Sequence, residues 1–189
     1  MSRRIGAVVA LCLLLGACGP AAAAKYDSFW AAITANPKLK SMQGFLDAAP
    51  DIKSALQNPK LAGSTVFAPT DDAFAAMQKL VPNAAELYKN SVIVKMAISI
   101  HLVPGMYPSD KLSNGMKLQS RLAGASGELT ILKSGGSVKV QSAGSTASVV
   151  EADIGAGEGG VLHVIDSMLL PVKISSGTPV AVPAAVGGR

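Results

Sequence analysis

The sequence predicts an α+β domain in which helices from the first half of the chain pack on a mainly antiparallel sheet from the second half. Over residues 26–56 and 70–100 the apolar residues recur at steps of three and four, which is the period of a helix. From residue 128 onward they alternate with polar residues instead, which is typical of strands. The N-terminus adds a third observation, because it has the composition of an export signal.

The export signal is predicted at residues 1–24. Two arginines precede an uncharged, mostly apolar run that is shorter than the roughly 20 residues of a membrane-spanning helix, so we expect no membrane insertion. Cleavage after Ala24 would leave Lys25 as the first residue of a secreted protein. The alternative is the tetrapeptide Leu-Gly-Ala-Cys that ends at Cys18, which resembles a bacterial lipobox. Lipidation of Cys18 would anchor the domain at a bacterial cell surface.

Composition argues against several functional classes. The two cysteines, Cys12 and Cys18, lie in the signal, so the mature domain has no disulfide framework and no thiol nucleophile. Without Arg3 and Arg4 the 17 basic residues fall to 15, which against 12 acidic residues leaves a net charge of +3. These basic residues are scattered and are not interleaved with aromatic residues. We therefore do not expect the protein to bind nucleic acid.

The helices are predicted in order along the first half. Residues 26–56 form two or three short helices, because prolines divide the apolar groups, and residues 65–68 form a brief apolar strand. Asn83, followed three residues later by Glu86, predicts the N-cap of a long helix that ends before the Pro-Gly pair at 104–105.

A further helix is predicted to begin after Thr70. The Thr70 hydroxyl suits an N-cap, and the carboxylates of Asp71 and Asp72 complement the positive end of the helix dipole. Adjacent residues in a helix point about 100° apart. We therefore assign both carboxylates to the stability of this helix rather than to an acid pair or a metal site.

The second half is predicted to form strands. Residues 128–133 and 137–141 flank a Ser-Gly-Gly turn and form a hairpin, and residues 146–154 and 160–170 form further strands. The last of these is apolar enough to be central. Residues 173–189 show no apolar period, so they are interpreted as a flexible tail rich in Pro, Ala and Gly.

Three segments, residues 64–74, 101–107 and 160–171, resemble the signature segments of the fasciclin domain family in order and separation. The resemblance implies one fasciclin-like domain over residues 25–172, a β-sandwich or wedge of mainly antiparallel strands with several α-helices packed on it. The residues that carry it, all expected to serve the fold, are Thr65, Phe67, Pro69, Thr70, Asp71, Asp72, Phe74, His101, Pro104, Gly105, Tyr107, His163, Asp166 and Pro171.

The resemblance also implies a function. Fasciclin-like modules are extracellular, show no enzymatic activity and need no cofactor, and they mediate cell adhesion or contact with matrix or cell wall by noncovalent binding to protein or polysaccharide. Family members often carry Tyr-His where this chain has Ile100 and His101, and that tyrosine has been implicated in integrin adhesion. The resemblance therefore gives no support for integrin binding, and we expect Ile100 in the core.

The two histidines, His101 and His163, are not spaced as zinc ligands, so neither a metal site nor a catalytic site is predicted. His163 lies between apolar residues of a strand, and we expect it to be buried and to tie that strand to a loop such as the turn around Thr70. The rival interpretation is a small-ligand carrier or an enzyme that uses an apolar cleft between helices and sheet. A deep cavity would favour that rival, and a filled core would favour the adhesion module.

Overall fold

The computed structural model describes residues 25–58 and 63–174. The predicted signal, Cys18 and all of the predicted tail except Lys173 and Ile174 lie outside the described residues. Within the described part of the chain no helix is long and apolar enough to cross a membrane.

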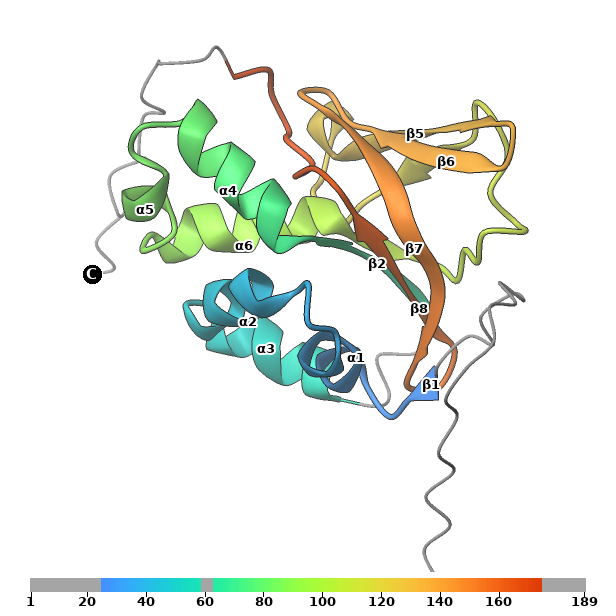
Figure 1. The fold of residues 1–189 in the computed structure, drawn as a ribbon, viewed down its shortest axis with the longest axis horizontal. Coiled ribbons are helices and arrows are strands. Elements are labelled where there is room, and N and C mark those ends of the chain that lie inside the picture. Colours follow the sequence, from blue (N-terminus) through green and yellow to red (C-terminus); the bar gives the residue numbers. More distant parts are fainter. Residues whose placement is uncertain (1–24, 59–62, 175–189) are drawn as a thin grey trace, which may run out of the picture.

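The helices gather on one side of the sheet (Figure 1). Three short helices precede the first long strand, as the apolar periodicity predicts. The helices are α1 (Phe29–Ala35), α2 (Lys40–Asp47), α3 (Pro50–Gln57), α4 (Asp71–Leu80), α5 (Ala84–Leu87) and α6 (Ser91–His101).

The prediction of one helix from Asn83 to residue 100 is wrong, because the structure divides this segment into α5 and α6. The Asn83 side chain does not cap α5. Asn90 supplies the cap instead, since its side-chain oxygen accepts hydrogen bonds from the N–H groups of Val92 at 3.0 Å and Ile93 at 3.3 Å. The longer helix therefore begins at a polar residue that the sequence prediction passed over.

Eight strands form one strongly bent sheet in the order β3-β2-β8-β7-β6-β5-β4, with β1 beside β7. The pairs β2–β8 and β1–β7 are parallel and the other pairs are antiparallel, which confirms a mainly antiparallel sheet. The strands are β1 (Lys25–Tyr26), β2 (Ser64–Pro69), β3 (Leu102–Pro104), β4 (Lys117–Gln119), β5 (Glu128–Ser134), β6 (Ser137–Gln141), β7 (Thr146–Ala156) and β8 (Gly160–Ile165).

The last strand is shorter than predicted, because β8 ends at Ile165 rather than near residue 170. Asp166 ends it: its N–H donates to the carbonyl of Ser148 at 3.0 Å, and its carboxylate accepts the Ser148 N–H at 2.7 Å. The residues that follow leave the sheet and cross toward the helices.

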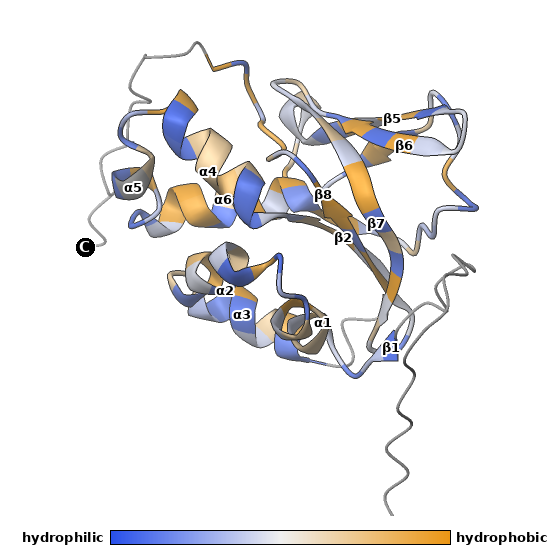
Figure 2. Ribbon diagram, in the orientation of Figure 1, coloured by the Kyte–Doolittle hydropathy of each residue, from blue (hydrophilic) through white to orange (hydrophobic). Residues whose placement is uncertain are grey.

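The sheet separates two hydrophobic cores. Alternate residues of β2 and β8 face opposite sides: Val66 and Leu162 pack with the helices, whereas Phe67 and Ile165 pack with the β4–β6 half of the sheet. Figure 2 shows these two strands as largely apolar where they pass between the two halves. Ile100 is fully buried in the second core.

Candidate binding surface

The first signature segment is joined to the turn after β3 by the hydroxyl of Thr65. This buried hydroxyl donates to the carbonyl of Gly105 at 2.7 Å and accepts the N–H of Tyr107 at 3.0 Å. Gly105 has φ +109°, and a Cβ built there would lie 2.5 Å from the Tyr107 ring. Only glycine therefore fits this turn without strain.

The start of α4 follows the predicted capping pattern. The Thr70 hydroxyl accepts the N–H of Ala73 at 3.3 Å. The Asp71 carboxylate accepts the backbone N–H of Ser41 at 2.6 Å and so joins α4 to α2, whereas Asp72 is exposed in the first turn. These two carboxylates therefore differ in role, and only Asp71 bridges two helices.

His163 lies fully buried in β8 and ties this strand to the loop that contains Tyr107. Its Nδ1 accepts the N–H of Asp153 at 3.4 Å, which leaves Nε2–H to donate to the Tyr107 carbonyl at 2.9 Å. The ring stacks on Phe67 with centroids 5.5 Å apart. Burial lowers the pKa of His163, against the opposing effects of the Tyr107 carbonyl and the Asp153 charge.

The suggested contact between His163 and the turn around Thr70 is wrong. The N–H of Thr70 donates instead to the carbonyl of Ile165 at 3.0 Å, on the neighbouring parallel strand. His163 points to the opposite side of the sheet from the helices, as its stacking partner Phe67 does.

His101, at the end of α6, holds the segment that follows β8. Its Nδ1–H donates to the Ala97 carbonyl at 2.6 Å, and its Nε2 accepts the N–H of Leu169 at 3.1 Å. Burial lowers the pKa of His101 to about 4, although the hydrogen bond to Ala97 acts in the opposite direction. Both histidines are therefore neutral parts of the fold near pH 7.

The remaining signature residues are apolar, and most of them are buried or half-buried. Phe74 is buried against Phe45, Pro69 is buried at the end of β2, and Pro104 is exposed at the end of β3. Pro171 is half-buried in the segment after β8, and Ile174, three residues further on, packs against the cluster that contains Val81.

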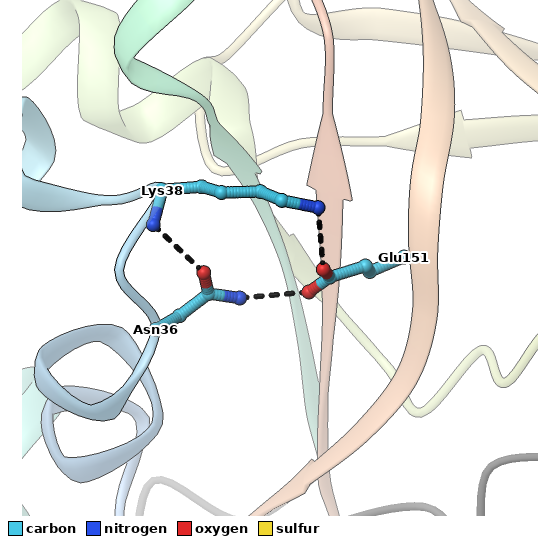
Figure 3. A network of polar contacts seen from close by, with 3 residues as sticks. All are labelled: Asn36, Lys38 and Glu151. Atoms are coloured by element: carbon cyan, nitrogen blue, oxygen red, sulfur yellow. Dashed lines mark hydrogen bonds and ion pairs between the residues drawn. The ribbon is translucent and has the colours of Figure 1, made fainter. Parts of the chain in front are cut away.

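Two polar networks were not predicted from the sequence, and the one around Glu151 is drawn in Figure 3. The Glu151 carboxylate accepts the Asn36 amide at 2.7 Å and the Lys38 ammonium at 2.8 Å, and the hydrogen bond from Lys38 lowers the pKa of this carboxyl. Elsewhere on β7, the Asp153 carboxylate accepts the N–H of Ser109 at 2.7 Å and also its hydroxyl. No local motif marks these pairs, because their partners lie far apart in sequence.

These contacts use the polar groups of the signature residues within the fold. In the described part of the chain, no three His, Cys, Asp or Glu side chains gather closely enough to hold a metal ion. The cavity between the helices and the sheet, which His101 helps to line, has a volume of about 20 Å³ and is otherwise surrounded by apolar residues.

A larger depression lies on the surface between α2 and α4, which we call the α2–α4 groove. Its volume is about 290 Å³. Aromatic residues from three parts of the chain meet there, although the sequence places them far apart. The groove is lined by Ser41, Gly44, Phe45, Phe74, Gln78 and Tyr88.

Comparison with known proteins places these features in a family context. Residues 37–171 match the family model of the fasciclin domain. A protein of the cyanobacterium Synechocystis, called protein sll1483, is 37% identical over 108 residues, which are 57% of this chain and 54% of the relative.

A solved structure shares the fold. It contains a FAS1 domain pair from the insect cell adhesion molecule fasciclin I and superimposes with a TM-score of 0.64 at 16% identity. The match covers 77% of this chain and 51% of that one. The chain thus spans about half the length of the relatives it matches.

Proposed function

The chain belongs to the fasciclin domain family, and from this premise we propose that it is an exported module that binds protein or polysaccharide outside the cell without chemical turnover. One observation carries the proposal. The two histidines and Thr65, Thr70 and Asp71, which would be the obvious polar groups for chemistry, make their hydrogen bonds within the fold. Recognition is then a property of the surface, as suits an adhesion module.

The rival interpretation, a carrier or an enzyme with an apolar cleft, has less support. A cavity of about 20 Å³ holds about one water molecule. Pockets that enclose a small-molecule ligand are usually roughly 300–1,000 Å³. The space between helices and sheet is therefore filled by side chains, which favours the binding module.

Two locations fit an exported module. Cleavage after Ala24 would release it into the surroundings, where it would contact matrix or cell wall. Lipidation at Cys18 would instead hold the same domain at a bacterial surface. The cell adhesion role belongs to the insect protein of the matching structure, and we extend only its general nature, noncovalent contact, to this chain.

Expression of the full chain in a bacterial host, followed by sedimentation with insoluble cell-wall and matrix material, tests the proposal. We expect the exported protein to sediment with one of these materials in a saturable manner, whereas an unrelated exported protein of similar charge stays in solution. The mass of the mature protein distinguishes release at Ala24 from diacylglyceryl modification at Cys18. Failure to sediment with any of the materials would contradict the proposal.

A further inference from the structure

The turn before β4 contains the one Asn-Gly pair in the sequence, Asn114 and Gly115. Both residues are exposed, and Gly115 has φ +78°. The N–H of Met116 donates to the carbonyl of Ser113 at 3.1 Å, so residues 113–116 form a β-turn. Asparagine is a chemically labile residue, and a glycine that follows it has no Cβ to shield its backbone nitrogen. Asn114 is therefore the asparagine of this chain that is best placed to lose its side-chain amide.

The loss of this amide, deamidation, consumes only water. The Gly115 nitrogen gives up its proton and bonds to Cγ of Asn114, the bond from Cγ to Nδ2 breaks, and the amide nitrogen leaves with that proton as ammonia. Water then opens the resulting five-membered succinimide ring at one of its two carbonyl carbons. The product is either aspartate or isoaspartate, and in isoaspartate the main chain runs through Cβ and Cγ and is one carbon longer.

The fold holds both reacting groups apart from one another. The Gly115 N–H donates to the carbonyl of Ile131 on β5 at 2.8 Å, so the attacking nitrogen is engaged as a donor. The side-chain oxygen of Asn114 accepts the N–H of Lys133, also on β5, at 3.0 Å. The N–H of Ile131 in turn donates to the Met116 carbonyl at 2.8 Å. The Gly115 nitrogen cannot reach the Asn114 amide until the turn separates from β5.

The turn leads into an edge of the sheet that is short. Strand β4 has three residues, lies at the end of the strand order and pairs with β5. Leu118 is its one buried side chain, 3% exposed, and it packs in the second core. Short, exposed elements open at a lower free energy than core strands do. The turn and β4 can therefore leave β5 while the rest of the domain stays folded.

We propose that Asn114 is a deamidation site and that opening of the turn from β5 sets the rate of its modification. This inference is independent of the proposed function. While the turn is closed, the two hydrogen bonds to β5 preserve the amide. Isoaspartate at this position lengthens the main chain just before Lys117, so the modified turn no longer matches the pairing of β4 with β5. Modification thus converts a brief opening into a lasting one that frees Leu118 from the core.

Incubation of the mature chain in mildly alkaline buffer, followed by trypsin digestion and mass spectrometry of the peptide Leu112–Lys117, tests this proposal. We expect the folded chain to lose the amide at least about tenfold more slowly than the same chain in guanidinium chloride. The slowing should equal the protection of the Gly115 N–H against hydrogen exchange, because both report the same opening. Asn114→Gln, whose ring would have six members, should stay unmodified over the same time.

Two matched truncations locate the opening. Leu118→Ala loosens β4 and should raise the rate of amide loss in the folded chain, whereas Leu46→Ala, in the helix core, should raise it clearly less. Equal rates in the folded and unfolded chain, no loss of the Asn114 amide in the unfolded chain, or equal acceleration by both truncations would each overturn the inference. If either variant fails to fold, as circular dichroism would show, the comparison of amide loss with hydrogen exchange in the parent decides.

Discussion

Burial keeps His101 and His163 in the neutral form, and each ring accepts a backbone N–H at one nitrogen. For His101 the donor is Leu169 at 3.1 Å, and for His163 it is Asp153 at 3.4 Å. A proton added to either acceptor nitrogen would face that N–H and place a charge in the core. Burial accordingly lowers both pKa values, that of His101 from the ordinary 6.5 to about 4.

We expect the free energy of unfolding to fall as the pH drops from about 6.5 toward 4. In this window the unfolded chain binds a proton at His101 and the folded chain does not, so protons favour unfolding. The contribution of His101 is fully present above pH 6.5, and about 3 kcal/mol of it is lost near pH 4. Urea denaturation at pH 7.5, 6 and 5 measures this. His101→Gln should reduce the change in the free energy of unfolding between these pH values. Equal stability of the parent at all three pH values would contradict the role assigned to His101.

Thr65 offers a second test at a single residue. Thr65→Val keeps the shape of the side chain but leaves the N–H of Tyr107 and the carbonyl of Gly105 without their partner. We expect a loss of about 1–3 kcal/mol in the free energy of unfolding, because unsatisfied buried groups are costly. Thr65→Ser, which keeps the hydroxyl, should lose clearly less. Thermal denaturation of the two variants side by side makes the comparison, and equal losses would rule out the hydrogen bonds as the cause.

Among the secondary-structure elements, α6 depends on Asn90 for its start. Asn90→Ala removes the acceptor for the N–H groups of Val92 and Ile93, and we expect it to cost about 1 kcal/mol of stability. Asn90→Ser retains an acceptor and should recover most of the loss. Chemical denaturation measures both changes. A serine variant as unstable as the alanine variant would argue against capping.

The elements show what sequence could and could not predict. Apolar periodicity predicts α1 to α4 and the strands β2 and β5 to β8, and the Thr70 hydroxyl predicts the N-cap of α4, because these signals lie within a few residues of one another. It misses the break between α5 and α6, the end of β8 and the short strands β1, β3 and β4. The pairing of β2 with β8 joins residues about 100 positions apart, and it decides which side of the sheet His163 faces. The partners of Glu151 and the packing of Phe45, Phe74 and Tyr88 against one another arise in the same way. Local patterns carry no information about such contacts.

On the scale of the whole molecule, β2 and β8 belong to both hydrophobic cores. Val66 and Ala68 of β2 pack with the helices, and Phe67, which lies between them, packs with the β4–β6 half of the sheet. The His101 bond to Leu169 adds a second connection, from α6 to a residue of the second core. If either core unfolds, β2 and β8 lose packing that the other core also needs.

We therefore expect the helical half and the sheet half to unfold together. Trp30 lies beside the helix core, so its fluorescence reports on that half, whereas Phe67 is fully buried in the other core. Phe67→Ala should lower the free energy of unfolding by about 3–5 kcal/mol and shift the Trp30 transition by the same amount. Fluorescence and far-ultraviolet circular dichroism, followed in one denaturant series, measure both transitions. If Phe67→Ala left the Trp30 transition unchanged, the two cores would be independent and the shared strands would not couple them.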